Sequence, residues 1–170
     1  MTEAQTLRHI ITTRKSIFPS EYSDAPIAKE VLEEIISSAD YAPNHKRTKP
    51  WRLKAYRGTD KALFGEELVR LYKENVPAEH FSERKMNEIA QKVAKSDTIV
   101  TISICFSGKV PEWEEIAATA MAVQNMYLTC TAHGVGCYWG TPGFMFQMKD
   151  FLKLEENERC YGFFFMGMKK

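Results

Sequence analysis

The run from Ile116 to Ala132, IAATAMAVQNMYLTCTA, contains no charged residue and constrains how the rest of the chain can fold. Pro111 and several acidic residues come just before it, which is typical of the first turn of a helix. The run is short for a membrane span and carries Gln124, Asn125 and three threonines, so a buried helix is favoured over a transmembrane one. An uncharged helix of this length needs cover on every side, and a partner subunit could provide some of it.

Length and composition describe a globular chain with one domain, residues 1–170. Hydrophobic residues make up 44% of the chain and charged residues 26%, which is ordinary for a globular protein. The formal net charge of +1 provides no overall field that would attract nucleic acid or acidic lipid. The first residues, Met1 to Gln5, lack the basic and apolar segments of a signal peptide.

The four cysteines have the spacing of neither a metal site nor a redox pair. No two of them form a Cys-x-x-Cys motif, and their neighbours are apolar, which indicates reduced, mostly buried thiols of a cytoplasmic protein. Cys130 and His133 are close in sequence, but they stand on no recognisable metal-binding loop. We therefore expect no metal site.

Hydrophobic periodicity predicts helices and strands on both sides of the central run. Helices are expected at residues 3–13, from Pro26 to the loop at Pro43, at 59–74, at 82–94 with Ser82 as N-cap, and at 144–154. Strands are expected at 51–56, 98–106, 137–139 and 161–166, and the β-branched segment 98–106 is expected at the centre of a sheet. Gly134 suits a left-handed helix C-cap.

The segment Ala42-Pro43-Asn44-His45-Lys46-Arg47-Thr48-Lys49-Pro50-Trp51 joins a predicted helix to a predicted strand. Proline biases the preceding residue away from helical backbone, so Ala42 and Lys49 are expected to be extended and the loop to be stiff at both ends. A rigid turn with this many cationic and hydrogen-bonding side chains suits an anionic ligand. The alternative interpretation is a basic loop that faces water.

Two other segments could contact a phosphorylated, flat ligand. Arg14-Lys15-Ser16 follows the first helix, where cations either complement the helix dipole or grip a phosphate. The turn Gly140-Thr141-Pro142-Gly143 lets backbone approach a flat ligand closely. The sequence Gly134-Val135-Gly136 is too weak a signal to indicate a nucleotide-binding motif.

Taken in order, the segments resemble the FMN-dependent nitroreductase family, especially its compact, short-chain members, over nearly the whole chain. The resemblance is carried by Arg14-Lys15-Ser16-Ile17, by Ala42 to His45 with Lys49-Pro50-Trp51, by Val110 to Glu114 with the uncharged helix, and by Gly134 to Trp139 with Gly162 to Gly167. Two residues depart from the family's pattern. Lys15 stands where a second Arg is common, and Lys49 stands where Gln or Glu is common.

The resemblance implies an α+β fold, a mostly antiparallel sheet flanked by helices, in a homodimer with two FMN molecules at its interface. It also implies the roles of ten residues. The phosphate and ribityl chain would be held by Arg14, Lys15, Ser16 and either Lys169 or Lys170. The flavin would be faced by His45 and Lys49, from the same or the partner subunit. The ring edge would be met by the backbone of Trp139, Gly140 and Thr141. The C-terminal extension of many relatives is expected to be missing, because the chain stops at Lys170.

The function implied by the resemblance is reduction of nitroaromatic, quinone or other electron-poor acceptors by NAD(P)H, in a ping-pong hydride mechanism with FMN as the carrier. No side chain is expected to act as a catalytic acid or base. A flavin store or sensor without turnover would use the same loops. A basic-loop nucleic-acid binder is disfavoured by the net charge. The acceptor and the choice between NADH and NADPH are left open.

Overall fold

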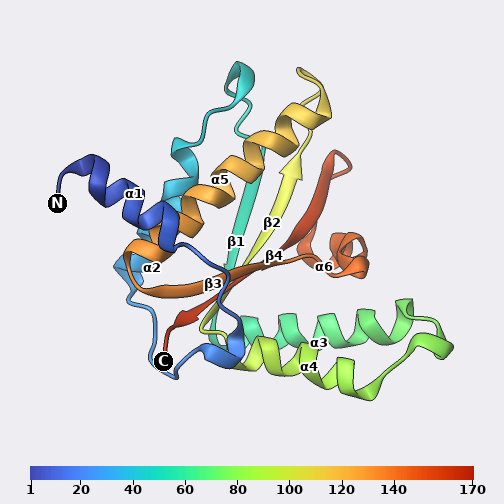
Figure 1. Cartoon of the computed structure of the whole chain (residues 1–170). Coiled ribbons are helices and arrows are strands. Elements are labelled where there is room, and N and C mark those ends of the chain that lie inside the picture. Colours follow the sequence, from blue (N-terminus) through green and yellow to red (C-terminus); the bar gives the residue numbers. More distant parts are fainter.

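The computed structural model describes residues 1–170 and has a four-stranded sheet at its centre, with the strand order β1-β2-β4-β3 (Figure 1). The strands are β1 (Trp51–Tyr56), β2 (Thr98–Cys105), β3 (Val135–Gly140) and β4 (Glu158–Met168). Every pair of neighbours is antiparallel. The expected α+β class with an antiparallel sheet is therefore confirmed, and 98–106 is a central strand as predicted.

A bulge interrupts the pairing of the two central strands. Ile102 of β2 pairs with Gly162 of β4, whereas the next residue, Ser103, pairs with Cys160. Tyr161 is consequently the extra residue of the bulge. Gly162 has a φ of +124°, which glycine adopts far more readily than residues with a Cβ. The bulge lies beside the end of β3, where the sequence predicts part of the functional site.

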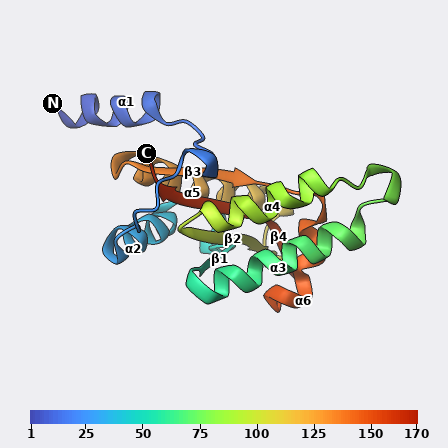
Figure 2. The same ribbon diagram turned by 90° about the horizontal axis from the view of Figure 1, so that it is seen from below.

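Helices cover both faces of the sheet because side chains on a strand alternate between its faces. Phe164 and Met166 of β4 belong to a core formed with α2 (Lys29–Ser38) and α5 (Glu112–Ala132). Phe163 and Phe165 belong to a second core, formed with α3 (Gly58–Asn75), α4 (Glu83–Lys95) and α6 (Lys149–Leu152). Figures 1 and 2 both show α3 and α4 lying side by side.

The N-terminal helix α1 (Glu3–Thr13) has the predicted bounds and projects from the rest of the molecule (Figures 1 and 2). Thr2 and Gln5 close it with a capping box, but none of its residues is buried. The long helix α5 is likewise open along one side, where Trp113, Ile116 and Met121 are exposed. A single chain therefore does not supply the cover that the uncharged helix requires. No helix combines the length and apolar content needed to cross a membrane.

Two predicted helices differ from the structure. The helix expected at Pro26 begins at Lys29, because Ala28 is still extended with ψ of 144°. The helix expected over residues 144–154 is a 3₁₀ helix, Gly143–Met148, followed by the single turn of α6; the tighter turns bury both Phe144 and Met148. The other predicted caps are confirmed, since Ser82 accepts a hydrogen bond from the Lys85 amide and Gly134 has φ of +70°.

Candidate functional site

The segment Arg14-Lys15-Ser16 connects α1 to the free edge of β3. The backbone amide of Arg14 still donates to Ile10 in the last turn of α1. Three residues later, the Ile17 amide donates to the Cys137 carbonyl of β3 at 2.9 Å. Tyr22 also holds Ile17 in position, because its hydroxyl donates to the Ile17 carbonyl at 2.8 Å. The segment is therefore fixed against the sheet, while Lys15 and Ser16 are exposed.

Tyr127 of α5 brings the Arg14 segment and the end of β3 together. The guanidinium carbon of Arg14 lies 5.3 Å from the centre of the Tyr127 ring, within the range of a cation–π contact. The Tyr127 hydroxyl accepts a hydrogen bond from the Trp139 backbone amide at 2.7 Å. Burial raises the pKa of Tyr127, and the nearby Ser16 side chain opposes that shift. Arg14, Ser16 and Trp139 thus converge on one side chain.

Sequence reasoning missed Tyr127, although a signal was present. It is the only tyrosine in the uncharged run Ile116 to Ala132. A buried tyrosine hydroxyl normally has a hydrogen-bonding partner, so its position in such a run indicates a polar contact in an apolar layer.

The end of β3 packs closely on the bulge of β4. The Trp139 indole donates from Nε1 to the Tyr161 carbonyl at 2.9 Å. A Cβ on Gly162 would lie 2.5 Å from the Gly140 carbonyl oxygen and 2.6 Å from Trp139 Nε1. No side chain would fit there, so Gly162 is needed to hold Trp139, Gly140 and Thr141 in this position.

Gly140 and Thr141 also border a cavity of about 220 Å³ on the other side of β3. The rings of Tyr138 and Phe165 stack there, with centroids 4.9 Å apart and an angle of 9° between their planes. The rest of the lining is mostly apolar and includes one cation, Lys92 of α4. An apolar hollow therefore borders the turn at which the sequence predicts a planar ligand, and the Tyr138 and Phe165 rings at its wall are themselves buried.

The loop from Ala42 to Trp51 is tied to the beginning of α5. His45 Nδ1 lies 2.6 Å from Glu114 Oε2, and Lys46 Nζ donates to the Lys109 carbonyl at 3.0 Å. Lys49 Nζ pairs at 3.6 Å with Asp40. The loop therefore has a defined shape that depends on contacts with residues distant in sequence.

The prediction for the backbone of this loop is half right. Ala42 is extended as expected, with φ of −70° and ψ of 138°. Lys49 is not, because its φ is +42°, and Lys46 and Arg47 are also left-handed at +50° and +53°. A hydrogen bond explains the difference, since the Lys49 amide donates to the side-chain oxygen of Asn44 at 2.9 Å and so turns the backbone back on itself.

The two parts of the predicted site do not meet within one chain. His45 contacts Glu114 near the start of α5, whereas Arg14 lies over Tyr127, in its second half. At 1.5 Å per residue, the two contact points are about 20 Å apart along the helix axis. His45 and Lys49 therefore form one group, and Arg14, Ser16, Trp139, Gly140 and Thr141 form another.

The two C-terminal lysines are placed differently from each other. Lys170 is bound to the turn at Ser20, whose carbonyl accepts from its Nζ at 2.8 Å. Lys169 forms a β-bridge with Tyr22. Lys169 is exposed directly after Met168, which pairs with Val135 at the start of β3, shortly after the end of α5. Lys169 is therefore the better candidate for a ligand beside Arg14.

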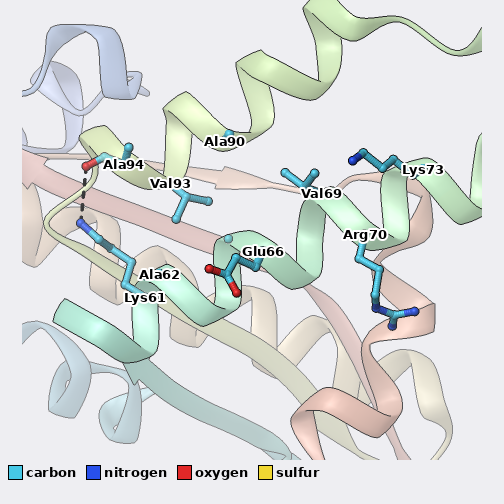
Figure 3. A pocket seen from close by; sticks show the side chains of 10 residues that line it. Lys61, Ala62, Glu66, Val69, Arg70, Lys73, Ala90, Val93 and Ala94 are labelled. Carbon is cyan, nitrogen blue, oxygen red and sulfur yellow. Dashed lines mark hydrogen bonds between the residues drawn. The ribbon is translucent and has the colours of Figure 1, made fainter.

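A larger cavity, of about 500 Å³, lies between α3 and α4 and contains none of the predicted site residues (Figure 3). Its walls are mainly small apolar side chains such as Ala62, Ala90 and Val93. Lys61 at its end is used structurally, since its Nζ donates to the Ala94 and Ser96 carbonyls at the end of α4. Nowhere in the chain are three His, Cys, Asp or Glu side chains grouped so that they could hold a metal ion. All four cysteines are free, and three are buried, as predicted.

Comparison with known proteins gives consistent matches over nearly the full length. A model described as "Nitroreductase family" matches residues 11–168. The Bacillus subtilis protein named "Putative NAD(P)H nitroreductase YfhC" is 26% identical over 159 residues, which is 90% of this chain and 79% of that protein.

Solved structures match the fold. The nitroreductase-like family protein from Bacillus cereus has a TM-score of 0.82 at 22% identity, covering 100% of this chain and 89% of that chain. The FMN-dependent nitroreductase NfnB from Mycobacterium smegmatis, solved in complex with NADPH, has a TM-score of 0.80 at 14% identity. The match covers 99% of this chain and 90% of that chain.

Proposed function

Because the chain belongs to the nitroreductase family, we propose that it is an FMN-dependent oxidoreductase. In this proposal it uses NAD(P)H to reduce nitroaromatic, quinone or other electron-poor acceptors by a ping-pong hydride mechanism. Residues 1–170 act as one FMN-binding domain. The observation that carries the proposal is the convergence of Arg14, Ser16 and Trp139 on Tyr127, beside the hollow at Gly140 and Thr141.

The residues present suit both the phosphate and the flavin ring of FMN. Arg14 offers a guanidinium that can bind a phosphate through two hydrogen bonds, and Lys15 and Ser16 add an exposed ammonium and hydroxyl. Lys169 supplies a further cation. The apolar cavity beside Gly140 and Thr141 suits the edge of a planar ring, and Gly140 lets the backbone approach it.

When bound, FMN supplies the hydride chemistry, and the protein supplies binding and orientation. The chain's own residues hold the phosphate, place the ring edge against the backbone of residues 139–141, and keep one side of the site apolar. No side chain at the site is assigned as a catalytic acid or base. A flavin store or sensor is the alternative, because it needs the same contacts without turnover.

We further propose that the working unit is a homodimer with a site at each side of a two-fold axis. Support comes from the separation of about 20 Å between the His45 group and the Arg14 group, since a partner subunit could bring its own loop to the Arg14 group. The exposed apolar side of α5 provides the surface on which two copies could pair.

The test is to purify the protein without added cofactor and record its absorption spectrum. A flavin spectrum, FMN released on denaturation, and oxidation of NADPH or NADH that depends on a quinone or nitroaromatic acceptor would support the proposal. A yellow protein that oxidises neither coenzyme would favour the flavin store or sensor. A colourless protein that does not bind added FMN would refute FMN binding altogether.

A further inference from the structure

A second cationic surface lies where the loop from Ala42 to Trp51 meets the start of α5. It consists of Lys46, Arg47 and Lys109 and is called the Arg47 corner below. We propose that the Arg47 corner binds the 2′-phosphate of NADPH, so that the enzyme prefers NADPH to NADH. The inference rests on the proposed function and goes beyond it by selecting the coenzyme.

The charges at the corner do not cancel. Asp40 pairs with Lys49, Glu112 with Arg159 and Glu158 with Arg52. Glu114 lies against the His45 ring, and the buried Glu115 accepts from the Ser107 amide. Lys46, Arg47 and Lys109 are exposed, and none of them has a carboxylate partner. Three exposed cations without a carboxylate partner therefore lie on two segments that the hydrogen bond from Lys46 to the Lys109 carbonyl joins.

The corner is also held in a defined shape. Lys46 Nζ donates to the Lys109 carbonyl at 3.0 Å, which joins two segments far apart in sequence. Lys46, Arg47 and Lys49 all have positive φ, an unfavourable conformation for residues with side chains. Such strain persists only where surrounding contacts enforce it, and it is concentrated at ligand-binding sites. Arg47 is thus presented from a stiff turn rather than from a mobile loop.

NADPH and NADH differ only by the 2′-phosphate, a dianionic group that an arginine fork matches well. The flavin phosphate is a less suitable occupant of the corner, because the segment Arg14-Lys15-Ser16 already offers it a guanidinium, an ammonium and a hydroxyl group. Arg47 lies between His45 and Lys49, the two residues proposed to face the flavin. A coenzyme that approaches the flavin beside them would carry its distal phosphate past Arg47.

The direct test uses two nucleotide fragments and does not depend on turnover. Binding of adenosine 2′,5′-bisphosphate and adenosine 5′-monophosphate to the FMN-loaded protein is measured by calorimetry at low ionic strength, for wild type, Arg47→Gln and Arg84→Gln. Arg84 is a matched control, since it is exposed on α4 and paired with Glu88. We expect the wild-type protein to bind the bisphosphate at least tenfold more tightly than the monophosphate. Arg47→Gln should weaken bisphosphate binding about tenfold to a hundredfold, and Arg84→Gln should leave it unchanged.

Two binding results would overturn the inference. One is equal affinity of wild type for the two fragments. The other is bisphosphate binding that is lost in Arg14→Ala but kept in Arg47→Gln, which would place the phosphate at the flavin-phosphate segment.

Steady-state kinetics separates this inference from the proposed function. We expect Arg47→Gln to lower kcat/KM for NADPH and to leave kcat/KM for NADH unchanged. If the FMN-loaded enzyme uses both coenzymes equally well, the Arg47 corner has no such role, although the proposed function stands. If it oxidises neither coenzyme, the proposed reductase function fails, and the fragment titrations still decide whether the corner binds the phosphate.

Discussion

Tyr127 is the residue at which α5, β3 and the Arg14 segment meet. Replacing it with Phe keeps the ring beneath Arg14 but removes the oxygen that accepts from the Trp139 amide at 2.7 Å. A buried amide without an acceptor costs about 1–3 kcal/mol. We expect Tyr127→Phe to lower the free energy of unfolding by that order and to weaken FMN binding as the end of β3 loosens.

Denaturant titration and flavin titration would measure the two effects of Tyr127→Phe. Tyr41→Phe is the control, because Tyr41 is 85% exposed and should lose neither stability nor affinity. An unchanged Tyr127→Phe variant would mean that the Trp139 amide finds water instead and that Tyr127 does not organise the site.

Arg14 combines a small structural role with a large expected role in binding. Its contact with the Tyr127 ring is worth about 0.5–1 kcal/mol at an exposed site, whereas a charge-assisted phosphate contact is worth about 1.5–3 kcal/mol. Arg14→Ala should therefore weaken FMN binding about tenfold to a hundredfold and change the unfolding free energy much less. Arg8→Ala in α1 is the control, because Arg8 is also a surface arginine and is exposed. Equal losses of affinity and stability would show that Arg14 only supports the fold.

At the scale of single residues, the sequence predicts site residues that belong to a recognisable motif. It misses residues whose role depends on packing between distant segments. Arg14 and Ser16 could be proposed because a cation and a hydroxyl follow a helix. The position of Tyr127 in an uncharged run indicates only that its hydroxyl needs a polar partner, and nothing in the sequence identifies that partner as an amide of β3. The left-handed backbone of Lys49 was also missed, because the proline rule describes local sterics and the Asn44 hydrogen bond overrides it.

At the scale of elements, the pair of His45 and Glu114 connects the loop to α5. Removing the charge of Glu114 should release the strained turn, since His45 and Lys46 supply its contacts with this part of the chain. We expect Glu114→Gln to speed tryptic cleavage after Lys46 and Arg47 several-fold and to weaken FMN binding. Glu112→Gln is the matched control, because Glu112 pairs with Arg159 and not with the loop. Equal cleavage of both variants would show that Glu114 does not hold the loop.

Elements with a single dominant signal are predicted well. β2 consists mainly of β-branched residues and is buried over nearly its whole length, and its position at the centre of the sheet follows from that pattern. The segment 144–154 lacks such a signal. Its aromatic and methionine residues suit several kinds of turn, and the buried positions of Phe144 and Met148 decide for a 3₁₀ helix. In this segment, tertiary packing rather than local propensity determines the type of helix.

At the scale of the whole molecule, large apolar side chains are left exposed on both α5 and α1. Trp113, Ile116 and Met121 are exposed on α5, and Leu7 and Ile11 are exposed on α1. We expect the protein to be a homodimer with a mass of about twice 19.5 kDa in analytical ultracentrifugation. Met121→Glu should shift it toward monomers and release FMN. Leu63→Glu on α3 is the control, since Leu63 is similarly exposed, at 51%, but lies on neither of these helices. A Met121→Glu variant that stays dimeric would place the interface elsewhere.

A shared site makes a sharper prediction about mixed dimers. Arg14→Ala removes a phosphate-binding residue of the site, and the double variant His45→Ala with Lys49→Ala removes the two loop residues proposed to face the flavin. Each homodimer should bind FMN weakly, because both of its sites carry a lesion. If each site takes its loop from the partner, a heterodimer of the two variants has one site with both lesions and one with none. Differently tagged chains, co-expressed and purified through both tags, should then bind one FMN per dimer with wild-type affinity. A heterodimer with no tight site would show that each site is built from a single chain, and the separation of about 20 Å along α5 would then leave His45 and Lys49 outside the flavin site.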